Sequence, residues 1–263
     1  MQRSRYILGG FTALVCLFAV APVAIVVLES FTSTNYIMFP PPGLSLKWYA
    51  EILNRPEFIE SARVSFIVAC SAAIISTALG TMAAFALTRY EFFGSNLVRA
   101  LFLAPLSLPG LIFGLALLQF LAGLAIAREV TTLVIAHVLI TVPFCIRFIS
   151  VALMTVGKDI ELAAQSLGAA PWRAFQSITF PLIRSGISAS VIFSFILSFD
   201  EVAATLFLAS PNAMTLPVRI FIYIDQDYDP LVTSISSILV FIAIAAMVCI
   251  ARTVGLGRLF GIR

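Results

Sequence analysis

Six long apolar stretches constrain the fold of this chain more than any other feature of its sequence. The hydrocarbon core of a bilayer is about 30 Å thick, and a helix needs roughly 20 apolar residues to cross it. The stretches run approximately over 7–28, 62–88, 98–122, 131–153, 186–209 and 231–251. The sequence therefore predicts an all-α, polytopic membrane protein with six transmembrane helices.

The composition agrees with this prediction. Hydrophobic residues make up 61% of the chain and charged residues 11%, whereas soluble domains average about 45–50% apolar and about 25% charged residues. The net charge of +3 gives no reason to expect nucleic-acid binding. The cysteines lie in apolar runs without metal or disulfide spacing, which indicates packing residues. They are Cys16, Cys70, Cys145 and Cys249.

The distribution of basic residues predicts the orientation. The first apolar stretch is longer than the roughly 7–15 residues of a cleavable signal peptide, so we expect a retained helix. Six spans place both termini on one side. Of the 16 basic residues, those that fall on the opposite side are Lys47, Arg55, Arg63, Arg128 and Arg219. The positive-inside rule therefore predicts cytoplasmic termini and a cytoplasmic loop over 154–185.

The second span carries a stripe of small residues. Ala72, Ser76, Gly80 and Ala84 recur at every fourth position, which lets another helix approach closely. Packing within this chain and a seam with another subunit explain the stripe equally well.

The third span contains Pro105 and Pro109. Each proline removes a backbone donor, which is tolerated in a membrane only where protein or water covers the freed carbonyl groups. We expect this span to be bent, buried and close to a pathway. Before it, the segment LSLKWYAEIL predicts a short surface helix that carries Trp48 and Tyr49 near the membrane interface.

The loop over 154–185 predicts a helix, a glycine hinge and a second helix. Glu161 places negative charge in the first turn, where it complements the helix dipole. Ala163 and Ala164 leave one helical face without bulky side chains. Gly168 is expected to end the first helix and Pro171 to start the next.

Aromatic residues then dock the second helix of this loop near the membrane, and Pro181 separates it from the fifth span. Trp172 and Phe175 lie at helical spacing for that contact. A loop of this shape fits a surface that another protein grips. The alternative is a helix that lies in the membrane interface.

The segment LAAQSLGAAPWRAFQSITFP resembles the EAA signature of permease subunits of ATP-binding-cassette importers. The matching positions are Ala163, Ala164, Gly168, Ile178 and Pro181. Leu162 stands where the signature has Glu, with Glu161 one residue earlier, and Phe180 replaces Leu. The resemblance implies a coupling helix that inserts into a cleft on an ATPase. The coupling residues that it implies are Glu161, Ala163, Ala164, Gly168, Ala169, Pro171 and Trp172.

The resemblance covers nearly the whole chain, and the segments LPGLIFGLAL, SFDEVAATLFL and TLPVRIFIYI narrow it to the spermidine/putrescine-type branch. It implies a single permease domain over 1–263 with the type I, MetI-like architecture, in a bacterial inner membrane. The implied partners are a second permease subunit, most simply a different chain, an ATPase dimer and an extracytoplasmic substrate-binding protein. The chain has no G-x-x-x-x-G-K-[ST] loop, so we expect it to be non-catalytic and to bind no cofactor, with ATP and Mg used by the ATPase.

Asp200 and Glu201 are adjacent carboxylates in the predicted fifth span. Ionisable residues at membrane depth cost at least about 2.5–3.5 kcal/mol, so they usually face a cavity or a partner. On a helix they point about 100° apart, and we predict that Asp200 faces the pathway while Glu201 binds a packing partner. The alternative is that both pair with neighbouring helices. A carboxylate in a low-dielectric cavity attracts an ammonium group, which predicts polyamines or other amine-bearing solutes.

His137 is the single histidine and lies within the fourth predicted span. A lone buried imidazole indicates a packing residue rather than a proton relay, and no second ligand at metal spacing accompanies it. Asp225, Asp227 and Asp229 alternate in DQDYDP but lack the Gly and Glu of a calcium loop. They are expected to meet a docking binding protein or to keep the loop solvated.

Two other protein classes fit the sequence less well. A proton-coupled secondary carrier that uses Asp200 and Glu201 is the main alternative, but such folds commonly have paired repeats, and SFDE has no second copy. An intramembrane hydrolase would need a nucleophile and base, and neither G-x-S-x-G nor H-E-x-x-H occurs.

Overall fold

The computed structural model describes residues 2–127 and 129–253, with side chains over 8–127 and 129–248. Within these residues the regular elements are helices, and β pairing is limited to isolated bridges at Thr32–Leu44 and Ser210–Ala213. The helices are α1 (Gln2–Glu29), α2 (Lys47–Leu53), α3 (Pro56–Arg89), α4 (Ser95–Leu103), η1 (Ala104–Ser107), α5 (Gly110–Gly123), α6 (Val130–Thr155), α7 (Lys158–Ser166), α8 (Pro171–Ala174), η2 (Phe175–Thr179), α9 (Phe180–Phe199), α10 (Thr205–Leu208), α11 (Leu216–Gln226) and α12 (Leu231–Thr253). The prediction of an all-α fold is confirmed.

Several of these helices are long and apolar enough to cross a membrane. The five single segments are Leu8–Glu29, Pro56–Arg89, Val130–Thr155, Pro171–Phe199 and Leu231–Val248. A sixth crossing is obtained when α4 with η1 and α5 are counted together as one bent span. Counted in this way, the structure has the six spans that the sequence predicted.

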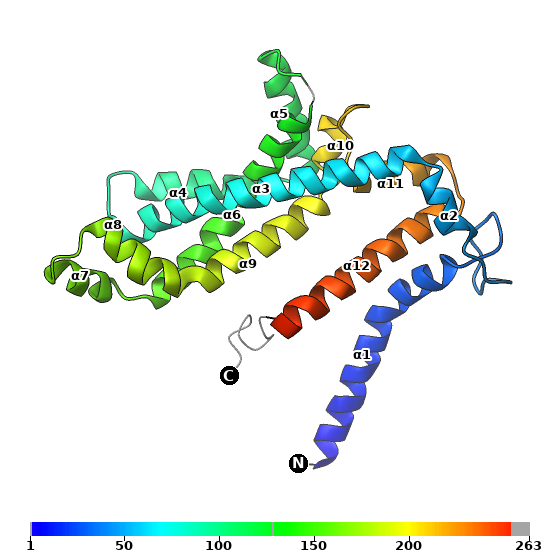
Figure 1. Cartoon of the computed structure of the whole chain (residues 1–263), viewed down its shortest axis with the longest axis horizontal. Helices are drawn as coiled ribbons and strands as arrows, with labels where there is room; N and C mark the ends of the chain where they lie inside the picture. Colours follow the sequence, from blue (N-terminus) through cyan, green and yellow to red (C-terminus); the bar gives the residue numbers. More distant parts are fainter. Residues whose placement is uncertain (1, 128, 254–263) are drawn as a thin grey trace. The chain divides into compact units, whose positions relative to one another are not determined.

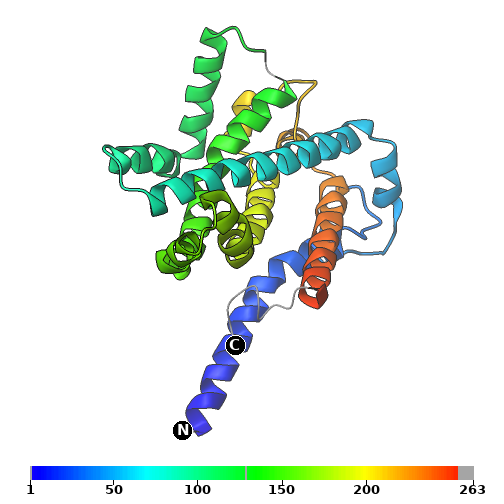
Figure 2. The same ribbon diagram turned by 60° about the vertical axis from the view of Figure 1, so that its left-hand side comes forward.

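The bent pair confirms one of the expectations for the third span. The chain turns by 111° between Ser95–Ser107 and Gly110–Gly123, so that α5 stands steeply on α4 (Figure 2). Pro105 lies in the short 3₁₀ helix η1, and Pro109 immediately precedes α5, which confirms the bend. Within this chain, α4 and η1 bury no side chain and the buried positions of α5 are Gly114 and Leu121, so the burial of this span stays a prediction.

The chain divides into two compact units. One unit is Glu60–Arg219, and the other combines Met1–Ile59 with Ile220–Arg263. The prediction of a single domain over 1–263 stays a prediction.

The unit Glu60–Arg219 has its core around α6, which lies along α9 (Figure 1). Half of the residues in the apolar, membrane-crossing stretch of α6 are buried. Apolar side chains from α3, α6 and α9 form the core cluster, which includes the fully buried Ile149, Leu153 and Ile183. Because lipid tails are as apolar as these side chains, close van der Waals packing between the three helices, and not removal from water, holds them together.

The small-residue stripe of α3 packs inside this unit. Ala72, Ser76 and Ala84 are fully buried, and a Cβ added at Gly80 would lie 3.2 Å from the backbone nitrogen of Ile146 on α6. The stripe therefore serves close packing of α3 on α6 within the chain, and that alternative is favoured over a subunit seam.

The interface of α6 with α9 also contains small polar residues. Ser190, Ser194 and Ser198 recur at every fourth position of α9, and all three are buried. The Sγ atom of Cys145 lies 3.0 Å from the Ser194 hydroxyl. Cys145 is thus a packing residue, as predicted, while the side chain of Cys249 lies outside the described residues.

The helix of the fifth span begins earlier than predicted. The chain stays helical from Pro171 to Phe199, because η2 is a single π-helical turn over Phe175–Thr179 that leads directly into α9. In that turn the Phe180 N–H donates to the Phe175 carbonyl, five residues back. A widened turn re-pairs the backbone before Pro181, which has no donor. Pro181 therefore does not separate the loop from the span.

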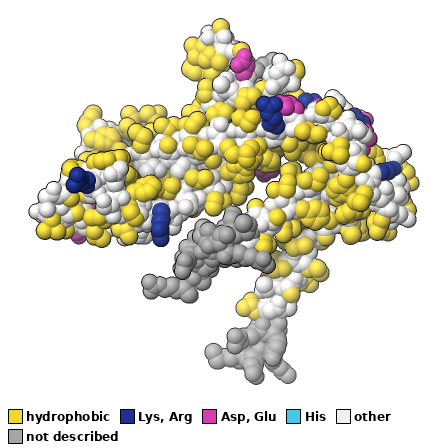
Figure 3. Space-filling view, viewed as in Figure 1, with side chains coloured by type: hydrophobic (Ala, Val, Ile, Leu, Met, Phe, Trp, Pro, Cys, Tyr) yellow, Lys and Arg dark blue, Asp and Glu magenta, His cyan; other side chains and the backbone are white. Residues whose placement is uncertain are grey.

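The outer surface of α3 is apolar. Phe66, Ile74 and Met82 are all more than half exposed, and hydrophobic side chains cover much of the surface in view in Figure 3, where charged ones are few. Such a surface requires lipid or another protein to cover it.

The unit formed by Met1–Ile59 and Ile220–Arg263 contains the predicted short helix, α2. Trp48 is buried rather than placed at an exposed surface, and its Nε1–H donates to the carbonyl of Thr34 at 3.0 Å. The Tyr49 hydroxyl lies 2.7 Å from both the Ser30 and the Ser237 hydroxyl, which joins α2 to α12 and to the residue that follows α1. These contacts fix the short helix within the unit.

Asp229 has a structural role at the start of α12. Its carboxylate accepts a hydrogen bond from the Leu231 N–H at 3.1 Å and from the Tyr223 hydroxyl at 2.7 Å. Burial, together with this hydrogen bond, raises the pKa of Tyr223 above its usual range, so the phenol remains a neutral donor. Asp225 and Asp227, in contrast, are exposed.

Candidate functional site

The loop between α6 and α9 folds as the predicted helix, glycine turn and second helix. Gly168 follows α7 with a left-handed φ of 91°. Its N–H donates to the Gln165 carbonyl at 2.9 Å, and the Ala169 N–H donates to the Ala164 carbonyl at 3.0 Å. These two bonds form a Schellman motif. Pro171 then starts α8 at a position where its missing N–H costs no hydrogen bond.

Large apolar side chains of this loop are exposed, beside polar residues such as Lys158, Asp159 and Gln165. We define the docking face as Ile160, Leu162, Leu167 and Trp172. Leu167 is 90% exposed and Trp172 is 64% exposed, and the other two are about half exposed. Ala163, beside them, is exposed and adds no bulk. Covering such side chains is worth about 1.5–3 kcal/mol each, so the docking face favours binding of a protein.

An aromatic cluster holds the second helix of the loop against α3. The Trp172 ring stacks on Phe175, with ring centroids 5.6 Å apart. Phe175 meets Phe85 of α3 edge-on, with ring centroids 5.1 Å apart. The sequence predicted that aromatic residues dock this helix near the membrane; in the structure Phe175 docks it on Phe85 of α3.

Glu161 points inward, away from the docking face. Its Oε1 accepts hydrogen bonds from Arg89 Nε at 3.0 Å, from Arg89 Nη2 at 2.7 Å and from the Thr179 hydroxyl at 2.8 Å. The side chains of Arg89 and Glu161 are 7% and 12% exposed. Sequence reasoning missed this ion pair, although a basic residue at the end of one span and an acid in the next loop were its signal.

The carboxylates of Asp200 and Glu201 do not lie on a continuous helix, which corrects the sequence prediction. Helix α9 ends at Phe199, and α10 begins at Thr205. Asp200 is exposed. Glu201 is half-buried and its Oε1 accepts a hydrogen bond from the Ala204 N–H at 2.7 Å. The angle of about 100° that a helix would set between the two side chains therefore does not apply. The two carboxylates differ because Asp200 is exposed, whereas Glu201 accepts a backbone hydrogen bond.

The helices on both sides of this break are held by His137. Its Nδ1 lies 2.7 Å from the Ser198 hydroxyl on α9, and its Nε2 lies 2.9 Å from the Thr205 hydroxyl on α10. The imidazole is almost fully buried. These bonds use both ring nitrogens, as the packing interpretation of His137 expects.

A close contact also fixes the break against α5. A Cβ added at Gly114 would lie 2.6 Å from both the Cα and the carbonyl oxygen of Ala204. The same α5 begins at Gly110, where an added Cβ would lie 3.9 Å from Glu201 Oε1. The bent third span and the segment with the two carboxylates are thus direct neighbours.

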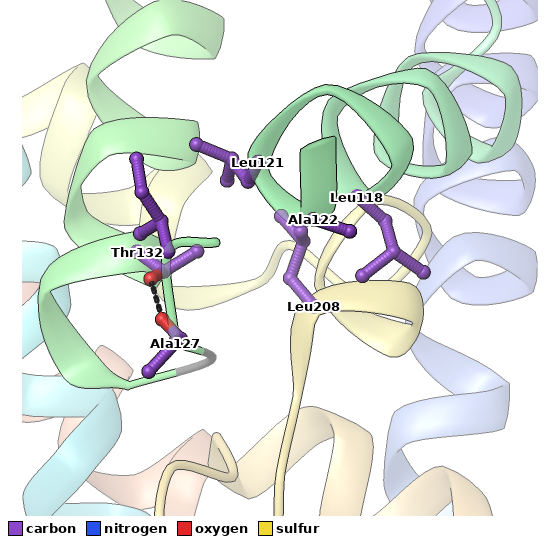
Figure 4. Close-up of a pocket in the computed structure, with 7 residues that line it drawn as sticks. Leu118, Leu121, Ala122, Ala127, Thr132 and Leu208 are labelled. Atoms are coloured by element: carbon purple, nitrogen blue, oxygen red, sulfur yellow. Dashed lines mark hydrogen bonds between the residues drawn. The ribbon is translucent and has the colours of Figure 1, made fainter. Parts of the chain in front are cut away.

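The structure also contains a cavity of about 260 Å³ near the end of α5, between Leu121, Ala122 and Leu208 (Figure 4). The hydroxyl of Thr132 in its wall donates to the Ala127 carbonyl at 2.6 Å. Among the described residues that line the cavity, none is charged, so they offer no carboxylate to a cationic solute. Among the described residues, no group of three His, Cys, Asp or Glu side chains is placed to hold a metal ion.

Comparison with known proteins gives a consistent result. Residues 76–260 match the family model described as the binding-protein-dependent transport system inner membrane component. The chain is 32% identical over 244 residues to the putrescine transport system permease protein PotI of Escherichia coli, covering 90% of this chain and 85% of PotI. It is 26% identical over 246 residues to the spermidine/putrescine permease PotC of the same organism, covering 93% and 92% of the two chains.

The fold matches a solved structure as well. A chain of the bacterial alginate ABC transporter, in complex with an alginate pentasaccharide-bound periplasmic protein, superposes with a TM-score of 0.72. The match covers 97% of this chain and 96% of the other at 14% identity. At this identity the likeness shows the fold.

Proposed function

Because the chain belongs to the family of binding-protein-dependent transport system inner membrane components, we propose that it forms half of the translocation channel of an ATP-driven importer. It is a multi-pass inner-membrane protein. The observation that carries the coupling part of the proposal is the docking face, which presents Leu167 and Trp172 on a turn fixed by Gly168. An ATPase subunit is the partner proposed for that face, and this chain itself is non-catalytic.

The proposed complex contains three further kinds of subunit. The first is a second permease, which is a different chain and completes the channel. The other two are an ATPase dimer and an extracytoplasmic substrate-binding protein. The binding protein is supported by the alginate transporter, which was solved with a periplasmic protein. The proposed orientation has both termini and the docking face in the cytoplasm, in agreement with the excess of basic residues there.

The proposed substrates are polyamines or related amine-bearing solutes. The names of PotI and PotC describe putrescine and spermidine/putrescine transport. Asp200 supports the same class, because it is exposed in a break between two apolar helices, where a carboxylate attracts an ammonium group. Glu201 is already engaged by the Ala204 N–H, so we assign contact with the solute to Asp200.

The family membership favours the importer over the proton-coupled carrier. A carrier would use Asp200 and Glu201 for protons and would not need a protein on the docking face.

Asp200→Asn tests the proposed substrate pathway. We expect uptake of radiolabelled putrescine or spermidine by the reconstituted complex to fall about tenfold, equivalent to about 1.4 kcal/mol of lost attraction. The ATPase subunit is expected to copurify with the variant as it does with the wild type. Glu91→Gln, at an exposed carboxylate of the loop between α3 and α4, is the matched control and is expected to transport normally. Normal uptake by Asp200→Asn in an assembled complex would show that this carboxylate does not meet the solute.

A further inference from the structure

The position of α7 depends on few contacts. No apolar residue of α7 is buried, so apolar packing supplies little of the energy that holds the helix in place. Among the hydrogen bonds and ion pairs described, the side-chain contacts that join α7 to other helices come from Glu161. Glu161 is therefore the main attachment of the docking helix to the rest of the protein.

The partners of Glu161 lie on the membrane-spanning helices. Arg89 is the last residue of α3. Its Nη2 also donates to the carbonyl of Val156, which follows α6, at 2.9 Å. Thr179 lies in the π-helical turn that continues into α9 and is fully buried. Two side chains, Arg89 and Glu161, thus join α7 to the ends of three spans.

The geometry of this ion pair favours a fixed link. The guanidinium donates through both Nε and Nη2 to one carboxylate oxygen, and charge-assisted bonds of this kind are short and directional. Other ion pairs of the described residues are far more open, for example Arg63–Glu60, whose side chains are 69% and 60% exposed. Exposed pairs contribute little, whereas removing one partner of a buried pair leaves an unpaired charge.

We infer that Arg89 and Glu161 form a strut that transmits movement of α7 to α3, α6 and α9, so that Glu161 is a positioning residue within the permease and not a contact to the ATPase. This inference rests on the proposed function, because it gives α7 a partner that moves it. A displacement of α7 acts through the strut on α6 and α9, which pack along each other, and on α3, which packs on α6. The strut joins α7, which carries part of the docking face, to α9, the helix that ends at the break beside Asp200.

The test compares Glu161→Gln, Arg89→Gln and the exchanged pair Arg89→Glu with Glu161→Arg in the full complex. We expect each single variant to keep its ATPase subunit bound but to lower putrescine uptake per ATP hydrolysed by about fivefold or more. The exchanged pair is expected to recover part of the loss, because it restores opposite charges at the same two positions. Exchange of the exposed pair, Glu60→Arg with Arg63→Glu, is the matched control and should leave the ratio unchanged.

Leu167→Glu separates the strut from the docking face. It places a charge on the docking face, so it should release the ATPase, whereas Glu161→Gln should not. If Glu161→Gln releases the ATPase as Leu167→Glu does, Glu161 is a contact residue and the inference is wrong. An unchanged ratio of uptake to ATP hydrolysis in Glu161→Gln would also overturn it.

Hydrogen exchange keeps the inference testable without a functional complex. In the purified chain, Glu161→Gln is expected to speed amide exchange across α7 about tenfold, equivalent to about 1.4 kcal/mol of lost local stability. If the wild-type chain binds no ATPase, the proposed function fails and this measurement still decides whether the strut holds α7. Equal exchange of α7 in both proteins would refute the strut.

Discussion

Replacing Gly168 with valine is expected to abolish coupled uptake and to release the ATPase subunit from the complex. Gly168 has a φ of 91°, and a residue with a Cβ loses about 1–2 kcal/mol in a left-handed conformation. A β-branched side chain is a stronger outlier there. The turn then has to change, which moves Leu167 away from Trp172 and divides the docking face. We expect ATPase retention, measured as ATPase copurified per permease, to fall at least about tenfold.

The control for Gly168→Val is Gly157→Val. Gly157 precedes α7 with a φ of −57°, which any residue adopts, and an added Cβ there meets nothing within 4 Å. The two substitutions add the same side chain at opposite ends of the same helix. Retention of the ATPase and normal uptake by Gly168→Val would show that the Schellman turn does not shape the docking face.

Replacing Gly114 with alanine is expected to destabilise the protein and to impair uptake. The new methyl group would lie 2.6 Å from the Cα and carbonyl oxygen of Ala204. These are backbone atoms, which cannot rotate away as a side chain does, so α5 and α10 have to separate. Overpacking of this kind costs about 1–3 kcal/mol, and we expect thermal unfolding in detergent to begin several degrees lower, at about 2–4 °C per kcal/mol. The shift also moves the segment that carries Asp200, which lowers uptake.

Gly123→Ala is the matched control for this substitution. Gly123 lies on the same helix, and a Cβ there meets nothing within 4 Å. Alanine has the higher helix propensity, so the control should be as stable as the wild type or more stable. Equal melting of Gly114→Ala and Gly123→Ala would contradict the close contact between α5 and α10.

The features that the sequence predicted well are those that depend on local chemistry. Span-length apolar stretches identified the membrane helices because the bilayer fixes their length. Gly168 and Pro171 marked the turn because left-handed backbone and a missing donor belong at particular helix positions. Pro105 and Pro109 located the bend for the same kind of reason.

The features that the sequence did not predict depend on distant residues. SFDEVAATLFL looks like a continuous apolar helix, but α9 ends at Phe199 and His137, 61 residues away from Ser198 along the chain, holds the two helix ends. The Arg89–Glu161 pair joins residues separated by 72 positions. Neither contact has a periodic signature. The small residues of α3 showed that a helix would pack closely there, but only the structure identifies α6 as that helix.

Pro181 does not end the helix that precedes it, because a π-helical turn accommodates it. A proline before a span usually ends the preceding helix, which is why a separate loop helix was predicted. The π-helical turn over Phe175–Thr179 instead re-pairs the backbone and lets the helix continue from Pro171 to Phe199. The same turn contains Thr179, which binds Glu161.

The most direct test of the central claim is putrescine uptake into proteoliposomes, measured with and without the ATPase subunit and ATP. The importer account predicts uptake in the complete complex with its binding protein and ATP, and none when the ATPase or ATP is omitted. It also predicts that an imposed proton gradient drives no uptake. Uptake by this chain without an ATPase, driven by a proton gradient, would contradict the account and would favour a secondary carrier that uses Asp200 and Glu201.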